Sequence, residues 1–276
     1  MSTLDELRAQ IDKLDDKVVS LLGERAELVL QVKTAKEKDK LDTYSPSRER
    51  QILDRVGKLA EAGKFPRAAV EKIFGTIISA TRSLIGETSV AYLGPEFSLG
   101  HEASIKQFGE AVQHTALASV EEVIAKVERG EVNYGLVPAE SGGSGLVLKT
   151  FAALFASKLL VVAEVLVKER LVGSDARFLV LGTKVPAKSG NDKTSIACIV
   201  PDKAGSLRDV LAPFADRGIT LLRIESKKLP DKNLESLFFI DFVGHVEDRT
   251  VAEVISTLQS LCLTVRVLGS YSATED

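Results

Sequence analysis

Apolar residues recur at alternating three- and four-residue steps between residues 4 and 36, the spacing that lines one face of a long helix. This apolar seam consists of Leu7, Ile11, Leu14, Val18, Leu21, Leu28 and Val32. Arg25 occupies the missing step between Leu21 and Leu28. Arg8 and Lys36 flank the same face, and no acidic residue takes the seam beside them. A guanidinium that faces other helices loses its water and needs an anionic partner. The pattern therefore indicates a pocket for a small anion; the alternative is an ordinary charged helix face from which Arg25 reaches solvent.

Two further helices follow. Turn formers and a proline collect at 39–46, so the first helix should end there and a second should begin near Ser47. A second break at 63–66 precedes a third apolar stripe, which runs from Arg67 and contains Val70, Ile73, Phe74, Ile77, Ile78, Thr81, Leu84 and Ile85. The first helix is too long for the other two to cover. We therefore expect an intertwined dimer to bury the rest of the seam.

After Gly86 short apolar runs alternate with helical segments. Strands are expected at 89–93, 134–137 and 159–167, and helices at 101–108, 120–129 and 147–156. Ser119 and Glu122 form a capping box for the middle helix. The alternation predicts a parallel sheet. The glycine-rich segment 141–145 lacks the lysine and spacing of a phosphate loop and the dinucleotide fingerprint, so we interpret it as a plain strand-to-helix turn.

The last part of the chain has a different order of elements. The pattern predicts a strand, a helix, two strands, a helix and a strand at 194–200, 205–216, 219–226, 237–244, 250–261 and 264–269. This order is the ferredoxin-like split βαβ arrangement of an α+β domain. Residues 184–192, with proline, glycine and serine among charges, are expected to be the linker before it.

Composition narrows the classes of function. The chain has 276 residues, 45% of them hydrophobic, which suffices for two or three domains with real cores. A net charge of −3 without a basic tract or tryptophan gives no support for a nucleic-acid or membrane-surface partner. No apolar run approaches the roughly 20 residues that span a bilayer, so we expect a cytoplasmic protein with a small-molecule partner. Cys198 and Cys262 lack CxxC spacing and the three histidines are scattered, which favours buried reduced thiols and no metal or cofactor.

Three groups of motifs carry a family resemblance. The stretches LRAQIDKLD, ERAELVLQVKTAK and YSPSRER resemble the helical chorismate mutase domain. VAYLGP and EEVIAKVERGEVNYGLVPAE resemble the first lobe of prephenate dehydratase, and DKTSIACIVPDKAGSL, GITLLRIES, FFIDFVGH and VRVLGSY resemble its ACT regulatory domain. The chain thus resembles a bifunctional chorismate mutase–prephenate dehydratase. The resemblance implies an all-α three-helix mutase domain at 1–87, a truncated α/β dehydratase-like lobe at 88–183 and an α+β ACT domain at 192–276.

The resemblance implies a chorismate site on the helices. The residues that stand where the family grips chorismate are Arg8, Arg25, Lys36, Arg48 and Glu49, and Val32, Thr81 and Ile85 stand at pocket positions. Arg8 and Arg25 suit carboxylate capture, with Arg8 reaching into the partner protomer's site. Lys36 suits the ether oxygen, and Arg48 with Glu49 suits the other carboxylate and the ring hydroxyl. The rearrangement to prephenate needs no nucleophile, base or metal, only a compact conformer and stabilised charge on the breaking ether oxygen.

Two departures from the family pattern affect activity. Ile85 stands where the family usually has Gln or Glu as a second donor to the ether oxygen, and losing one such donor costs about 10²- to 10³-fold in rate. In the dehydratase region a whole second lobe is missing after Val167, and Ala176 replaces the catalytic threonine of a Thr-Arg-Phe motif. The segment GPEFSLGHEAS at 94–104 and Glu140-Ser141-Gly142 also differ from the usual motifs. We interpret residues 88–183 as a structural spacer; the alternative is an active dehydratase with a minimal second lobe.

The resemblance also implies an effector site. Family members bind phenylalanine between one subunit's helix start and a neighbour's strand end, and the matching residues here are Gly205, Ser206, Leu207, Glu225 and Ser226. The helix N-terminus suits a carboxylate. Lys227 and Lys228 replace the usual Arg-Pro, so the effector is open, and the domain either senses an amino acid or serves only dimerisation.

The sequence leaves three functions to compare. The leading one is a chorismate mutase of phenylalanine and tyrosine biosynthesis that lacks dehydratase activity and that an amino acid regulates through the ACT domain. The second is a non-catalytic regulatory or assembly protein that binds phenylalanine or pairs with a full-length homologue, which Ile85 favours. The third is a mutase or lyase that acts on an aminated chorismate or on isochorismate.

Overall fold

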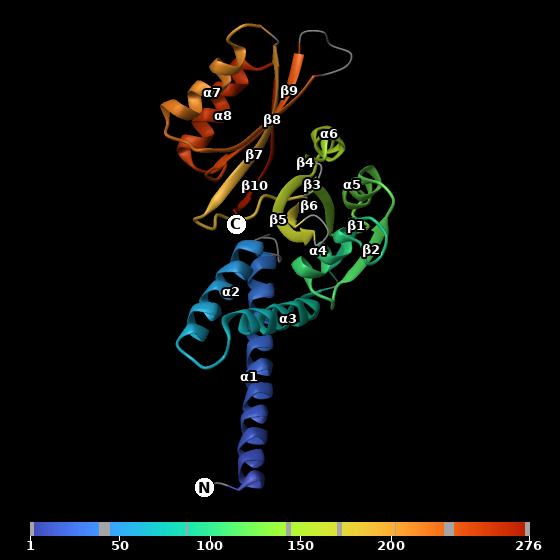
Figure 1. The fold of residues 1–276 in the computed structure, drawn as a ribbon, viewed down its shortest axis with the longest axis vertical. Helices are drawn as coiled ribbons and strands as arrows, with labels where there is room; N and C mark the ends of the chain where they lie inside the picture. Colours follow the sequence, from blue (N-terminus) through green and yellow to red (C-terminus); the bar gives the residue numbers. More distant parts are fainter. Residues whose placement is uncertain are drawn as a thin grey trace. The chain divides into compact units, whose positions relative to one another are not determined.

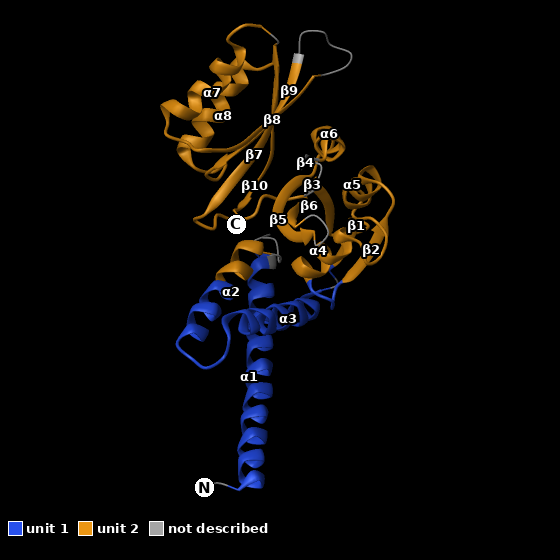
Figure 2. Cartoon of the chain, viewed as in Figure 1, with its two compact units in different colours: residues 1–44, 52–88, 109–112 blue, residues 45–51, 89–108, 113–276 orange. Residues whose placement is uncertain are grey.

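A computed structural model describes residues 3–38, 45–86, 88–141, 145–169, 173–201, 203–228 and 235–273. The chain divides into two compact units (Figure 2). Unit 1 comprises residues 1–44, 52–88 and 109–112, and unit 2 comprises residues 45–51, 89–108 and 113–276. Because the two units are separate bodies, each is described by itself.

Unit 1 is helical, as the sequence predicted. The helices are α1 (Leu4–Lys38), α2 (Pro46–Glu61, in this unit from Ile52 onward) and α3 (Arg67–Ile85). The second begins one residue before the expected Ser47, and the predicted break at 39–44 lies outside the described residues. Helix α3 crosses α1 part-way along its length (Figure 1). Among the described residues, no helix is long and apolar enough to span a membrane.

The apolar seam of α1 is open to solvent in the single chain. Leu7, Leu14 and Leu28 are 47%, 59% and 61% exposed. Such a continuous apolar face is unusual on the surface of a monomer. The seam is therefore a surface on which another helix can pack.

Unit 2 begins with an α/β lobe, which we call the lobe. Its strands are β1 (Ser89–Leu93), β2 (Gln113–Leu117), β3 (Tyr134–Ser141), β4 (Gly145–Leu146), β5 (Leu160–Glu169) and β6 (Ser174–Gly182). Its helices are α4 (Leu99–Phe108), α5 (Val120–Glu128) and α6 (Leu148–Ala156). The strands form one sheet in the order β2-β1-β3-β6-β5, and β4 pairs with β3.

The expectation of a parallel sheet was wrong for half of the lobe. β1 runs parallel to β2 and β3, but β6 runs antiparallel to both β3 and β5. The reason is the connection after β5: only four residues separate Glu169 from Ser174, too few for the crossover that a parallel neighbour needs. Gly173, with φ of 73°, lies at the end of this connection in a backbone region that favours glycine. The chain therefore folds straight back as a hairpin.

Two local predictions in the lobe have distinct outcomes. The capping prediction for α5 is confirmed, because the Glu122 N–H donates to Ser119 Oγ at 3.1 Å. The Glu122 carboxylate accepts a hydrogen bond from the N–H of Ala118 at 3.2 Å, whereas an ideal capping box would use the N–H of Ser119. The prediction of a plain strand-to-helix turn at 141–145 was wrong, because Ser141 pairs with Gly145 and the flanks form the β3–β4 hairpin. Residues 142–144 themselves lie outside the described residues.

The C-terminal part of unit 2 has the predicted ferredoxin-like fold. Its elements are β7 (Asp192–Pro201), α7 (Ser206–Asp216), β8 (Leu221–Lys228), β9 (Glu235–Val243), α8 (Arg249–Leu261) and β10 (Thr264–Ser272). The strands form an antiparallel sheet in the order β10-β7-β9-β8, with both helices on one face (Figure 1). Cys198 and Cys262 lie in the core between sheet and helices. Both are free and buried, as predicted.

The opposite face of this sheet packs on the lobe. The shared core contains Ala197, Leu237, Phe239, Leu268 and Tyr271 from the C-terminal sheet and Phe151, Leu154, Val161, Leu179 and Leu181 from the lobe. The rings of Phe151 and Phe239 lie 4.9 Å apart between centroids. Gly269 faces the backbone of Val161 so closely that a Cβ atom would lie 2.1 Å from the Val161 carbonyl oxygen. Only glycine fits this contact.

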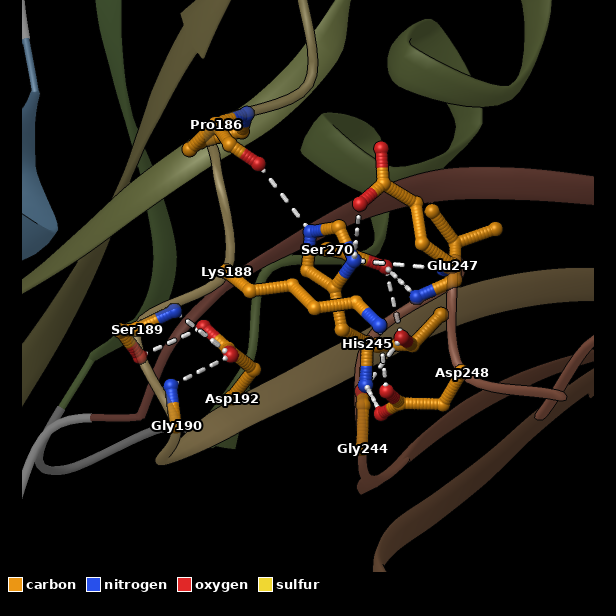
Figure 3. Close-up of polar contacts among 12 residues, drawn as sticks. Pro186, Lys188, Ser189, Gly190, Asp192, Gly244, His245, Glu247, Asp248 and Ser270 are labelled. Carbon is orange, nitrogen blue, oxygen red and sulfur yellow. Dashed lines mark hydrogen bonds and ion pairs between the residues drawn. The ribbon is translucent and has the colours of Figure 1, made fainter. Parts of the chain in front are cut away.

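The segment between β6 and β7, expected to be a linker, is fastened to the C-terminal domain (Figure 3). The Glu247 N–H donates to His245 Nδ1 at 3.2 Å, so His245 Nε2 carries the proton that it donates to the Pro186 carbonyl at 3.1 Å. Lys188 Nζ lies 2.8 Å from Asp248 Oδ1. The linker therefore has side-chain contacts at several points along its length.

Candidate functional site

The structure joins two of the predicted mutase residues, Arg25 on α1 and Thr81 on α3. Arg25 Nη1 donates a hydrogen bond to Thr81 Oγ1 at 2.6 Å. The Thr81 hydroxyl donates in turn to the Ile77 carbonyl, also at 2.6 Å. The lone pairs of the Thr81 oxygen therefore face the guanidinium. Arg25 is half-buried and Thr81 is buried, so the contact fixes the arginine where α1 crosses α3.

Ile85 lies one helical turn beyond Thr81, on the same face of α3. It is half-buried, and its side chain offers no hydrogen-bond donor. Val32 is exposed and Lys36 is half-buried on the C-terminal half of α1. These positions continue the helix faces on which Arg25 and Thr81 lie.

Arg8 is far from Arg25 within one chain. They lie seventeen positions apart on one continuous helix, which corresponds to about 25 Å along the helix axis. Arg8 is exposed and lies 3.6 Å from Asp5 one turn earlier. Arg8 therefore does not meet Arg25 of the same chain.

Arg48 and Glu49 lie in the first turns of α2, which belong to unit 2. Arg48 is exposed and Nη1 donates to Gln51 Oε1 at 3.4 Å, whereas Glu49 is half-buried. Because Arg25 and Lys36 belong to unit 1, a meeting of all five residues stays a prediction.

The expected effector residues surround the start of α7 and the end of β8. Gly205 caps α7 with φ of 91°, a conformation that favours glycine. The Ser206 hydroxyl is buried and has no hydrogen-bond partner among the residues that the structure describes. Leu207 is exposed, Glu225 is half-buried and Ser226 is exposed. A helix N-terminus with an unsatisfied buried hydroxyl is suited to an anionic group.

The structure also shows a charged cluster that the sequence did not predict, which we call the six-residue cluster. It comprises Glu140, Glu164, Arg177, Lys193, Arg223 and Asp241. Burial would lower the pKa of Arg177, but the charges of Asp241, Glu140 and Glu164 together raise it above its usual range. Burial raises the pKa of Tyr271 well above its usual range. Arg177 and Tyr271 therefore stay protonated at any ordinary pH.

A signal for this cluster existed in the sequence. Glu164 interrupts the apolar run LVVAEVLV of β5, where a carboxylate needs a buried partner. Arg177 does the same in β6. Their partners lie on strands far away in the chain, and only the fold reveals them.

Three family models match successive parts of the chain. Chorismate mutase type II matches residues 7–85, prephenate dehydratase matches 90–175 and the ACT domain matches 194–259. A bifunctional chorismate mutase/prephenate dehydratase of Aquifex aeolicus is 27% identical over 355 aligned positions that cover 98% of each chain. Because this chain has 276 residues, at least 79 of those 355 positions have no residue here.

Solved structures match about two thirds of the chain. A prephenate dehydratase from Streptococcus mutans has a TM-score of 0.60 and is 31% identical, over 68% of this chain and all of that chain. A prephenate dehydratase from Arthrobacter aurescens, solved in complex with L-Phe, has a TM-score of 0.60 at 21% identity, over 67% of this chain and 90% of that chain. Together the matches define a protein with a mutase domain, a dehydratase-like lobe and an ACT domain. The chain belongs to the bifunctional chorismate mutase/prephenate dehydratase family.

Proposed function

We propose that this protein converts chorismate into prephenate. In this isomerisation one C–O ether bond breaks and one C–C bond forms, so no atom is gained or lost and no cofactor is needed. The observation that carries the proposal is the Arg25–Thr81 contact where α1 crosses α3, inside the region that the mutase model matches. A guanidinium held by a neutral hydroxyl keeps a fixed direction, which suits capture of a carboxylate of the substrate.

The complete site in this proposal needs two copies of the chain. The seam of α1 is exposed over several turns, and about 25 Å separates Arg8 from Arg25. Packing two seams together buries the apolar face and brings Arg8 of one copy toward Arg25 of the other. Lys36, Arg48 and Glu49 complete the set, with Val32, Thr81 and Ile85 as pocket lining.

We further propose that the chain has no dehydratase activity. The hairpin connection between β5 and β6 spans four residues, where the sequence resemblance leads us to expect a whole second lobe. Ala176 has no hydroxyl, and it is buried in the hairpin opposite Val167. In the altered loop after β1, Phe97 has φ of 66° and is 88% exposed, although that backbone region favours glycine. Glu140 is held in ion pairs with Arg177 and Arg223.

For the ACT domain we propose an amino-acid effector whose carboxylate binds at the start of α7. Gly205, Ser206 and Leu207 supply that helix start, and Glu225 and Ser226 supply the strand end of a neighbouring copy. The unsatisfied Ser206 hydroxyl supports a ligand there. The L-Phe complex of the Arthrobacter aurescens protein makes phenylalanine the first effector to test.

The deciding experiment is to incubate the purified full-length chain with chorismate and to identify the products by chromatography and mass spectrometry. We expect prephenate and no phenylpyruvate, and no phenylpyruvate when prephenate is supplied directly. Phenylpyruvate formation would overturn the loss of dehydratase activity. Unchanged chorismate would overturn the mutase proposal. In that case isochorismate and an aminated chorismate would be tested next, because Ile85 departs from the family pattern. Turnover of either compound would favour an altered substrate, and no turnover would favour a regulatory protein.

A further inference from the structure

The six-residue cluster lies between the two sheets of unit 2. The lobe contributes Glu140 from β3, Glu164 from β5 and Arg177 from β6. The ACT sheet contributes Lys193 from β7, Arg223 from β8 and Asp241 from β9. The lobe side therefore carries two acids and one base, and the ACT side carries two bases and one acid. Each side alone has an uncompensated charge, and the two sides together are neutral.

Every ACT member of the cluster pairs with a lobe member. Arg177 Nη1 lies 3.1 Å from Asp241 Oδ2, and Lys193 Nζ lies 2.6 Å from Glu164 Oε2. Arg223 Nη1 contacts Glu140 Oε1. Within the lobe, Arg177 also lies 2.7 Å from Glu140 and 3.3 Å from Glu164. Arg177 is thus the member that all three carboxylates share.

These groups are withdrawn from water. The side chains of Glu164, Arg177 and Asp241 are 3%, 7% and 7% exposed. A buried charge that loses its partner is far more costly than the pair itself is favourable. Lobe and ACT sheet therefore cannot separate, or slide past each other by one residue, without stranding buried charges, because a displacement of about 3.3 Å pulls the ion pairs apart.

The apolar contacts between the sheets do not provide this constraint. Phe151 against Phe239 and the rest of the shared core bury area, but burial of apolar surface is non-directional and tolerates sliding. The apolar core makes the interface favourable, and the ion pairs restrict it to one register of the lobe against the ACT sheet. Without the lobe, the ACT sheet would expose both Phe239 and its three charged cluster members.

We propose that the lobe is retained as a cover for the open face of the ACT sheet, locked in one register by the six-residue cluster, so that lobe and ACT domain open only as one unit. Arg177 is the positioning residue at the centre of this lock. The role needs no dehydratase chemistry and does not depend on the proposed mutase activity or on an effector. It gives residues 88–183 a function beyond that of a spacer.

The test is hydrogen exchange on the full-length chain, comparing amides of β6 in the lobe with amides of β9 in the ACT sheet. In the native protein we expect equal protection of both strands. In Arg177→Met, which leaves Asp241 without its partner, we expect both protections to fall by about 10²-fold or more and to become unequal. The matched control is Arg249→Met on the surface of α8, where the arginine side chain is 93% exposed and pairs with Glu253. It should change protection by less than about twofold.

A second variant separates charge from bulk and guards against a misfolded single variant. Arg177→Met combined with Asp241→Asn leaves Glu140 with Arg223 and Glu164 with Lys193, so the remaining charges balance. We expect this double variant to regain at least about tenfold in protection over Arg177→Met, with equal values in β6 and β9. Unequal protection in the native protein, equal protection retained in Arg177→Met, or no recovery in the double variant would each overturn the proposal.

Discussion

Arg25 in unit 1 and Arg177 in unit 2 are both arginines withdrawn from water, but their surroundings differ. Arg25 is half-buried beside an exposed apolar seam, and it donates a hydrogen bond to the neutral hydroxyl of Thr81 at 2.6 Å. Arg177 is buried and lies within 3.3 Å of Glu140, Glu164 and Asp241. The Thr81 hydroxyl orients the Arg25 guanidinium and carries no charge, whereas the three groups around Arg177 are carboxylates.

The difference separates a binding role from a structural one. A neutral hydroxyl partner adds little free energy and fixes the direction of the guanidinium, which suits a residue that meets an anionic ligand. Carboxylate partners neutralise the guanidinium in the folded protein, which suits a residue that holds two sheets in register. Removing Arg25 should therefore cost activity, and removing Arg177 should cost stability.

The largest expected effect comes from Arg25→Ala. If Arg25 holds a substrate carboxylate, kcat/KM for chorismate should fall by about 10²- to 10³-fold, while the melting temperature stays within error of the native value. Arg67→Ala, which removes an exposed arginine of the same unit that pairs with Glu61 and Glu71, is the matched control. Rate assays paired with circular dichroism melts measure both effects. A large loss of melting temperature with retained turnover would show that Arg25, like Arg177, is structural.

The second prediction adds a donor to unit 1. Ile85→Gln places an amide one turn from Thr81, and it should raise kcat by up to about 10²-fold if that amide reaches the ether oxygen. KM should change less, because charge on that oxygen develops in the transition state. Ile85→Leu keeps the volume without the donor and serves as the control. An unchanged or lower rate in Ile85→Gln would mean that another group already fills this role or that the substrate differs.

A smaller effect is expected from Thr81→Val, which keeps the side-chain shape and removes the hydroxyl. Loss of one hydrogen bond that orients Arg25 should lower kcat/KM by about five- to tenfold. The control is Thr76→Val, an exposed threonine on the same helix whose hydroxyl also bonds a helix carbonyl. Equal effects of the two variants would indicate a general loss of α3 stability and no orienting role.

The smallest effect concerns an exposed ion pair of unit 2, in contrast to the buried cluster. A hydrogen bond from Lys188, with another from the His245 N–H, lowers the pKa of Asp248 below its usual 3.8. This pair's stabilisation is therefore present above pH 3.8 and lost as the pH falls through the lower, folded value. Because Asp248 is 40% exposed, Asp248→Asn should cost only a few tenths of a kcal/mol at pH 6.

Thermal melts of native protein and Asp248→Asn between pH 6 and pH 3 measure this difference. It should shrink at the acid end, where the native carboxyl becomes protonated. Asp216→Asn, an exposed position at the end of α7, is the control. A difference that grows toward pH 3 would contradict the assignment.

The sequence predicted elements whose apolar pattern is strong and local. Helix α1 was found because its seam repeats over many turns, and the order of the ACT elements because each has its own period. Strand β2, at the edge of the sheet, was missed because it begins with the polar residues Gln113, His114 and Thr115 and so has no apolar alternation. Strand β6 was missed because its residues were interpreted only as a motif of the family resemblance. Without β6, the antiparallel part of the sheet could not be predicted.

The candidate site divides in the same way. Arg25 could be found from the sequence because it interrupts a periodic seam on its own helix. The partners of Arg177 could not, because Asp241 lies 64 residues away and pairs with it only after two sheets have packed. The family resemblance assigned Arg25 and Thr81 to one site, but the hydrogen bond between these two residues, 56 positions apart, was seen only in the structure.

The length of α1 has a consequence for how activity depends on the population of molecules. On the proposed dimer, each pocket takes Arg25 from one chain and Arg8 from the other, because about 25 Å of helix keeps them apart within a chain. Only the dimer then turns over chorismate, and activity is lost when dilution separates the two chains. Two defective chains, one lacking Arg8 and the other lacking Arg25, would together rebuild one intact pocket out of two, so that a mixture of inactive proteins becomes active.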